Sequence, residues 1–266
     1  MPVNDELGKR MKEYYEQVPK TRLVRRMPVA IRIDGKAFHT FTRGFEKPFD
    51  HTLISAMQNT MKKLCENIQG CIFGYTQSDE ITLILKDYNK LNTSAWFDYE
   101  VQKMCSIAAS MATLYFNQFF RDALNETMQG QVGLSKVGIA HMCAKDKGAM
   151  FDARCFNIPK EEVENLIYWR QIDAYRNSRQ MVGQAYFSAK ELEGKSCTKI
   201  VDMLKEEKGI DFDNDYFSYE KYGTVCYKEE NEETGRSYWF ATSWDHLMND
   251  TDRAFIQGIV DNVEEE

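Results

Sequence analysis

Two aspartates with small or polar neighbours are candidate ligands for a divalent cation. Asp34 precedes Gly35, and Asp79 lies between Ser78 and Glu80. Carboxylates held close together repel one another unless a cation neutralises them, and oxygen ligands favour Mg²⁺ or Mn²⁺ over zinc. Two such ions bridged by two aspartates suit nucleotidyl transfer. Gly35 would let the backbone approach a ligand and can offer its carbonyl to the metal.

The segment that follows Asp34 has the groups needed to hold a triphosphate. Lys36 and His39 supply cations, and the backbone amides of this segment, which also includes Ala37 and Phe38, supply hydrogen-bond donors. An isolated Asp-Gly pair is a simple turn in most proteins. The interpretation therefore depends on the elements that position these residues.

The hydrophobic pattern between residues 28 and 143 predicts the order β-α-β-β-α-β. The first strand alternates, with apolar Val29, Ile31 and Ile33 on one face. The predicted elements are a strand at 28–34, a helix capped by Asp50 that ends near Asn67, strands at 71–77 and 81–85, a helix at 96–120 and a strand at 134–143. A strand at 150–158 and a helix from 159 to about 188 follow. This order is typical of the ferredoxin-like fold, in the α+β class.

The predicted topology brings the two aspartates together. In a ferredoxin-like sheet the first strand lies antiparallel to the third, so its carboxyl end adjoins the turn between the second and third strands. Asp34 stands at the first of these places and Asp79 at the second. We therefore expect their carboxylates to meet at one edge of the sheet.

Composition indicates a folded globular chain with uneven charge. Of its 266 residues 43% are hydrophobic, and the formal net charge is −7. Residues 1–47 hold 11 Lys and Arg against 6 Asp and Glu, whereas residues 207–266 hold 5 against 16. We predict a catalytic domain with an N-terminal helix over 1–194. An extension over 195–266 is expected to pack on it and to end in a disordered acidic tail, Glu264–Glu266.

Several classes of protein are excluded by motif or composition. No run of 18 apolar residues exists and the first residues are charged, so neither a membrane span nor a secretory signal is predicted, and we expect a cytoplasmic protein. The 7 cysteines form no C-x-x-C pair and the 4 histidines form no H-E-x-x-H, which argues against zinc. Ala189 stands where a Walker A motif ending at Gly194–Ser196 needs glycine, and no G-x-G-x-x-G occurs.

Five short segments resemble, in order, the tRNA-histidine guanylyltransferase family and its Thg-like relatives. They are Arg32–His39, Glu46–Asp50, Tyr75–Glu80, Phe151–Arg154 and Tyr168–Asp173, with a weaker match at Lys221–Thr224. The resemblance spans about residues 28–228. Each segment alone is modest evidence, but five in sequence are specific.

The resemblance implies an enzyme that adds nucleotides to the 5′ end of tRNA in the 3′–5′ direction, on a core like the palm of polymerases. The 5′-monophosphate is first activated with ATP or GTP, and the 3′-hydroxyl of an incoming nucleotide then displaces the activating group. Two Mg²⁺ ions and a homotetramer are also implied. The cations available for tRNA phosphates are Lys9, Arg10, Lys20, Arg22, Arg25, Arg26, Lys145 and Lys147.

The resemblance also assigns roles to individual residues. Asp34 and Asp79 are similar to the side-chain ligands of the metals, with Gly35 giving its carbonyl. Glu80 is the acidic neighbour of this site, and Lys47 is similar to a lysine of the activation step. The expected nucleotide-binding residues are Asp34, Gly35, Lys36, Ala37, Phe38, His39, Ser78, Asp79 and Asn177.

One motif departs from the family pattern. Members that add guanosine to tRNA-histidine carry W-R-Q-x-D-x-H-I-N-N, whereas here Tyr175 and Arg176 replace His-Ile and Ser178 replaces the second Asn. This favours the Thg-like branch, which repairs tRNAs shortened at the 5′ end. Arg170, Asp173 and Asn177 form a polar stripe on this helix. The stripe faces a nucleotide or the sheet, or it is a solvated face with local ion pairs.

Three alternative functions remain open from sequence. The first is addition of G at position −1 of tRNA-histidine. The second is a palm-fold nucleotide cyclase or dinucleotide synthase, which shares the architecture. The third is a non-catalytic RNA-binding module, against which the two aspartates count.

Overall fold

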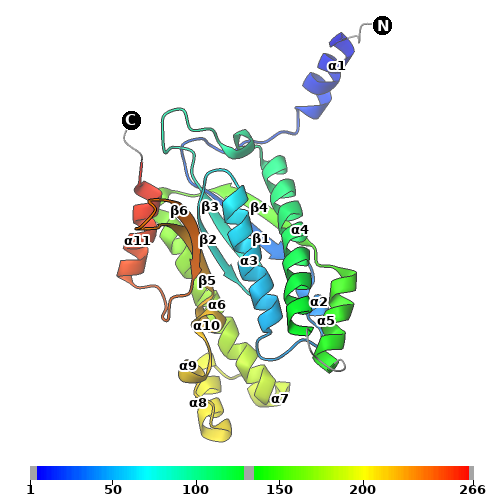
Figure 1. Ribbon diagram of the computed structural model, residues 1–266, viewed down its shortest axis with the longest axis vertical. Helices are drawn as coiled ribbons and strands as arrows, with labels where there is room; N and C mark the ends of the chain where they lie inside the picture. Colours follow the sequence, from blue (N-terminus) through cyan, green and yellow to red (C-terminus); the bar gives the residue numbers. More distant parts are fainter. Residues whose placement is uncertain (1–4, 129–134, 264–266) are drawn as a thin grey trace.

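The computed structural model describes residues 5–128 and 135–263, which form one six-stranded antiparallel sheet with helices on both faces (Figure 1). The strand order is β4-β1-β3-β2-β5-β6. The strands are β1 (Val29–Gly35), β2 (Cys71–Gln77), β3 (Glu80–Leu85), β4 (Phe151–Asn157), β5 (Thr224–Glu230) and β6 (Ser237–Thr242). The first four strands have the 4-1-3-2 order of the ferredoxin-like fold, so the predicted α+β, palm-like fold class is confirmed.

Helices α3 and α4 lie side by side on one face of the sheet, and α6 and α11 pack on the other (Figure 1). Helix α1 projects from the body at the end opposite α8 and α9. The helices are α1 (Asp5–Met11), α2 (Phe38–Phe41), α3 (His51–Asn67), α4 (Val101–Met128), α5 (Lys136–Lys147), α6 (Val163–Tyr186), α7 (Ala189–Leu192), α8 (Cys197–Lys208), α9 (Phe212–Asp215), α10 (Ser218–Tyr222) and α11 (Asp250–Asp261). None of the helices that the structure describes is long and apolar enough to cross a membrane.

The alternation of β1 creates the two cores. Ile31 and Ile33 are fully buried against α3 and α4, whereas Ala30 faces α6 and α11. Arg32 and Asp34 share the face of Ala30 because side chains alternate along a strand. Asp34 therefore emerges at the end of β1 on the α6 side.

The strand predicted at 134–143 is wrong. Residue 134 lies outside the described residues, and those from Lys136 onward form α5, whose N-terminus is capped when Ser135 accepts a hydrogen bond from the Gly138 amide at 3.0 Å. His141 and Ala144 are buried three residues apart, which is a helical period. The fourth core strand is β4, within the strand predicted at 150–158. Lys145 and Lys147 accordingly precede the fourth strand and lie in the last turn of α5.

The other predicted elements are present with shifted ends. Helix α3 begins after Asp50, whose side chain accepts a hydrogen bond from the Leu53 amide, as the capping prediction requires. The helix predicted at 96–120 is a short 3₁₀ turn, Trp96–Tyr99, followed by α4. Residues beyond 195 supply β5, β6 and α8, which packs on α6. The predicted acidic tail at 264–266 lies outside the described residues.

Candidate active site

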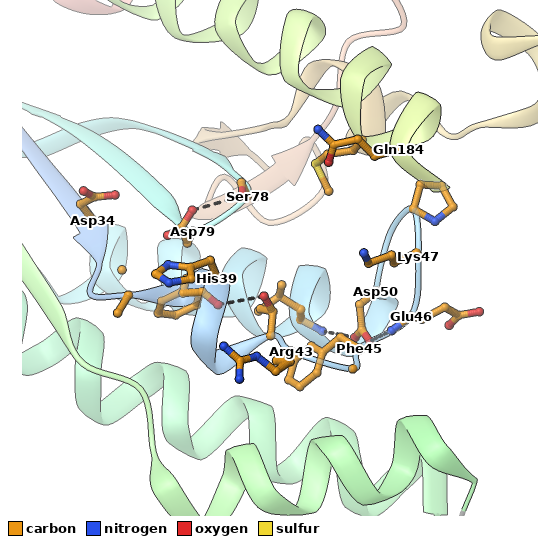
Figure 2. Close-up of a pocket in the computed structure, with 18 residues that line it drawn as sticks. Asp34, His39, Arg43, Phe45, Glu46, Lys47, Asp50, Ser78, Asp79 and Gln184 are labelled. Carbon is orange, nitrogen blue, oxygen red and sulfur yellow. Dashed lines mark hydrogen bonds between the residues drawn. The ribbon is translucent and has the colours of Figure 1, made fainter. Parts of the chain in front are cut away.

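A cavity of about 730 Å³ opens at the carboxyl end of β1 (Figure 2). Its wall is formed by the end of β1, the turn between β2 and β3, the α2 segment with the loop after it, and the last turns of α6. The lining residues are Asp34, Gly35, Ala37, Phe38, His39, Thr42, Arg43, Gly44, Phe45, Glu46, Lys47, Pro48, Asp50, Leu53, Ser78, Asp79, Met181 and Gln184.

The sheet brings Asp34 and Asp79 to the same end of this cavity (Figure 2). The backbone amide of Gly35 donates to the Asp79 carbonyl at 3.1 Å, which ties the end of β1 to the β2–β3 turn. Residues 34 and 80 are directly opposite in the antiparallel register of β1 and β3. Two carboxylates separated by 45 positions in sequence thus line one site, in the geometry that the strand order predicts.

Burial and mutual repulsion disfavour the charged forms of both carboxylates. Burial, followed by the charges of Asp34 and Glu80, raises the pKa of Asp79 to about 6 despite hydrogen bonds from its own backbone and from Ser78. Burial, with the charges of Glu80 and Asp152, also raises the pKa of Asp34. The nearest guanidinium, that of Arg154, is 3.9 Å from the Asp34 carboxylate and largely exposed. The charges of Arg32 and Arg154 lower the pKa of Asp34 but do not outweigh burial and the acidic neighbours, and no ion pair of Asp79 is present among the described residues. Carboxylates whose charged forms are disfavoured in this way are stabilised when a metal cation binds between them.

The donor set fits Mg²⁺. In the residues that the structure describes, no group of three or more His, Cys, Asp or Glu side chains could hold a metal. Magnesium does not need such a cage, because it usually binds one or two carboxylates and completes its octahedron with water and substrate phosphate. Asp34 and Asp79 supply the carboxylates, and the Gly35 carbonyl is close in sequence.

Basic side chains line the cavity beyond the aspartates. His39, Arg43 and Lys47 are all exposed to it. Ala37 and Ser78 both have left-handed backbone conformations, with φ of 54° and 53°. Such strain in residues other than glycine is concentrated at functional sites.

Gly35 is required by a close approach. A Cβ atom at this position would lie 2.3 Å from the Phe38 ring. That ring is buried and packs on Phe41, Phe116 and Phe151 at centroid distances of 5.0–5.5 Å. Phe38 therefore forms the floor of the cavity as part of the core.

Three predicted site residues lie outside the main cavity. Lys36 is exposed and its amide donates to the Met150 carbonyl at 2.8 Å. Asn177 lines a smaller adjoining pocket of about 70 Å³, which shares Ser78 with the cavity. Glu80 faces α6 and lines neither.

Comparison with known proteins identifies the family. The family model described as Thg1, tRNAHis guanylyltransferase, matches residues 8–159, which is more than half of the chain. The chain belongs to the tRNAHis guanylyltransferase family. It is accordingly a nucleotidyltransferase.

Two solved structures with the Thg1-like description and one viral protein are similar to this chain over most of its length. A bacterial Thg1-like protein in complex with ATP has a TM-score of 0.80 and 37% identity, with 96% of this chain and 99% of that chain covered. A bacterial Thg1-like protein in complex with GTP has a TM-score of 0.75 and 36% identity, with coverage of 97% and 100%. Uncharacterized protein R259 of Acanthamoeba polyphaga mimivirus is 30% identical over 241 residues, 85% of this chain and 78% of that protein.

The contacts of Arg170 show the structural role of the Tyr168–Asp173 segment, one of those that resemble the guanylyltransferase family. This buried guanidinium binds the Glu80 carboxylate, which also binds Arg32, and it lies 3.2 Å from Asp173. Of the polar stripe predicted on α6, Arg170 thus faces the sheet. Because Glu80 follows Asp79 directly, this network fixes the turn that carries Asp79.

The segment at Lys221–Thr224 is explained by a second contact. The Tyr75 hydroxyl donates to the Tyr222 carbonyl at 2.9 Å. Gly223 has a φ of 76°, and a Cβ there would lie 2.5 Å from the Tyr75 oxygen. The glycine therefore lets β5 pair with β2 close to the turn between β2 and β3.

Among the cavity residues that the sequence did not predict are Arg43, Met181 and Gln184. Arg43 was counted only as a basic residue, and no motif marks it. Met181 and Gln184 follow Asn177 at i+4 and i+7, on the same face of α6. Continuing the polar stripe of α6 by two turns would have found them.

Proposed function

We propose that this protein adds nucleotides to the 5′ end of tRNA in the 3′–5′ direction and repairs tRNAs that lack 5′ nucleotides. The observation that carries the proposal is the pair of carboxylates with raised pKa values, Asp34 and Asp79, at one end of a cavity that is also lined by His39, Arg43 and Lys47. A site with metal-binding acids beside cations suits a nucleoside triphosphate. The complexes of bacterial Thg1-like proteins with ATP and GTP support this substrate class.

Each residue has a defined task in this mechanism. Asp34, Asp79 and the Gly35 carbonyl would hold Mg²⁺, which when bound polarises phosphoryl oxygens and lowers the pKa of a hydroxyl. Lys47, Arg43 and His39 attract the triphosphate and offset the charge that develops on it. The floor formed by Phe38 keeps water from one side of the site.

The reaction then requires two displacements. The 5′-monophosphate of the RNA attacks the α-phosphorus of ATP or GTP, and pyrophosphate leaves. The 3′-hydroxyl of the incoming nucleoside triphosphate attacks the activated 5′ phosphorus, losing its proton as the nucleoside monophosphate leaves. Both displacements transfer charge between phosphates at the carboxylate end of the cavity.

The repair branch is favoured by the residue that replaces the family histidine. The Tyr175 ring stacks on Tyr222 at a centroid distance of 5.2 Å and contacts Phe212. Arg176 pairs with Asp173 at 2.5 Å. Both side chains are thus occupied in packing or ion pairing, and neither lines the cavity. This supports a reaction that does not require specific recognition of the −1 guanosine.

The decisive experiment is an extension assay on tRNA. A tRNA lacking its 5′ nucleotide should be extended by the nucleotide complementary to the opposing base, only with Mg²⁺ and with ATP or GTP. Asp34→Ala and Asp79→Ala should abolish incorporation while circular dichroism stays unchanged; retained activity in both variants refutes the site. Extension only of full-length tRNA-histidine, by G, favours the −1 guanylyltransferase alternative. A cyclic product from GTP alone favours the cyclase, and RNA binding in EDTA without turnover favours the binding module.

We also propose a homotetramer located in the cytoplasm. The projecting N-terminal segment supports assembly because its apolar side chains, among them Leu7, Met11 and Tyr14, are largely exposed. Basic residues of the same segment, such as Lys9 and Arg10, then add to an RNA surface built from several subunits. A monomeric mass by light scattering, together with full activity, contradicts the tetramer.

A further inference from the structure

The wall of the cavity contributed by α6 differs from the rest of the lining because it carries no charge. It consists of Met181 and Gln184, three residues apart on one face of the helix. Figure 2 shows Gln184 across the cavity from Asp34 and Asp79, on the side of Lys47. The triphosphate of a nucleotide binds best beside cations, so its uncharged base is expected to lie against the neutral wall.

The other polar side chains of the lining are charged or already hydrogen bonded. Thr42 donates to the Phe38 carbonyl at 2.8 Å, and Ser78 donates to Asp79 at 3.1 Å. Asp50 is buried and accepts hydrogen bonds from His141 and two backbone amides. Within the described part of the chain, the carboxamide of Gln184 is exposed and forms no hydrogen bond. It is a neutral donor and acceptor ready for a ligand.

The chemistry of this pair of side chains matches a purine base. Met181 is 39% exposed, and its flexible thioether can pack on a flat ring. A glutamine amide accepts from the N6 amino group of adenine and donates to N1. After a half-turn of the amide it donates to O6 of guanine and accepts from N1–H. A pyrimidine presents similar groups but reaches less far from the ribose.

We propose that Gln184 binds the Watson–Crick edge of the purine of the activating nucleotide and thereby lets the site accept both ATP and GTP. This inference rests on the proposed function, because it assumes a nucleoside triphosphate in the cavity. The reversible amide makes the native site tolerant of both purines. A side chain at this position that can only accept hydrogen bonds would make the site select one purine over the other.

The substitution Gln184→Glu tests this directly. A carboxylate can accept from N1–H and the N2 amino group of guanine, but it faces the lone pair of adenine N1 without a proton to donate. The ratio of the dissociation constant for ATP to that for GTP should rise about tenfold. The added charge repels both triphosphates alike and cancels in the ratio. Gln184→Leu should weaken both nucleotides about three- to tenfold and leave the ratio near its native value.

A matched control is available on the same helix. Gln180 is exposed on α6 but does not line the cavity, so Gln180→Glu adds the same charge without touching the base. Binding of ATP and of GTP with Mg²⁺ is measured by calorimetry on the full chain without tRNA, after circular dichroism has verified each fold. A ratio in Gln184→Glu equal to that in Gln180→Glu overturns the inference.

The two proposals can fail separately. If the ratio shifts but no tRNA is extended, Gln184 binds the base of a nucleotide used for another reaction, and the proposed function is wrong. If tRNA is extended and the ratio does not shift, the function stands and the role of Gln184 is refuted.

Discussion

Asp79 and Glu80 are consecutive acidic residues with opposite electrostatic environments. Asp79 points into the cavity, and burial together with the charge of Asp34 raises its pKa to about 6. Glu80 lies between the guanidinium groups of Arg32 and Arg170. The carboxylate without a counter-charge is available to a cation or substrate, whereas the paired one stabilises the turn. For two neighbouring acidic residues, the charged partners of each carboxylate therefore indicate whether it can bind a ligand or stabilises the fold, whereas its distance from the site does not.

The largest expected effect comes from Asp79, the carboxylate without a charged partner among the described residues. Asp79→Asn should lower nucleotide incorporation about a thousandfold, because the site loses half of its carboxylate pair. The free energy of unfolding should not fall, since the substitution removes repulsion with Asp34. Single-turnover assays and urea titration measure the two quantities. A marked loss of stability breaks the comparison, because Asp79 would then be structural like its neighbour.

Glu80→Gln should have the reverse profile. The buried Arg170 loses a charged partner, so the free energy of unfolding should fall by about 2–3 kcal/mol. Activity should remain well above that of Asp79→Asn. Glu66→Gln is the control, because Glu66 pairs with Lys63 at 3.0 Å in an exposed position and its loss should cost about 0.5 kcal/mol or less. Equal losses in the two variants would show that the network around Glu80 adds nothing.

Asp50 provides an intermediate case on the same cavity. Burial alone would raise its pKa, but hydrogen bonds from His141 and the amides of Leu53 and Glu46 outweigh it and lower the pKa of Asp50 below its usual value. Its stabilisation is therefore present above about pH 4 and is lost as the pH falls through the lower native value. In Asp50→Asn, stability near neutral pH should fall by about 1–2 kcal/mol, and the parent and variant curves should converge in acid. Parallel curves would contradict the assignment.

The sequence predicted the sheet edge that carries Asp34 and Asp79 more reliably than the segments around it. The alternation of Val29, Ile31 and Ile33 and the Ser78–Glu80 turn indicate strands of a ferredoxin-like sheet, whose order predicts the meeting of Asp34 and Asp79. The pattern of residues 134–143 predicts a strand because small residues obscure its helical period, whereas the structure has a helix from Lys136 onward. Only the Ser135 cap and the burial of His141 reveal the helix.

Contacts between distant elements were not predictable from local pattern. The position of Glu80 between Arg32 and Arg170 depends on how α6 packs across the sheet. The inclusion of Gln184 in the cavity depends on the direction of the same helix. A single sequence indicates which residues have reactive or charged side chains. It does not indicate which of these side chains form ion pairs or hydrogen bonds with distant residues.

The ion pair between Arg170 of α6 and Glu80 sets a lower limit on the length of chain that can form the proposed active site. A fragment cut after Ile158 would retain all four ferredoxin-like strands and nearly all of the matched region, yet it would lack Arg170 and the β5 edge that covers β2. Asp79 would then lie on a hairpin without its support from α6, and the exposed edge of β2 would be a template for aggregation. A shortened version of this enzyme must therefore retain the ion pair of Glu80 with Arg170, and it must be truncated only beyond β5.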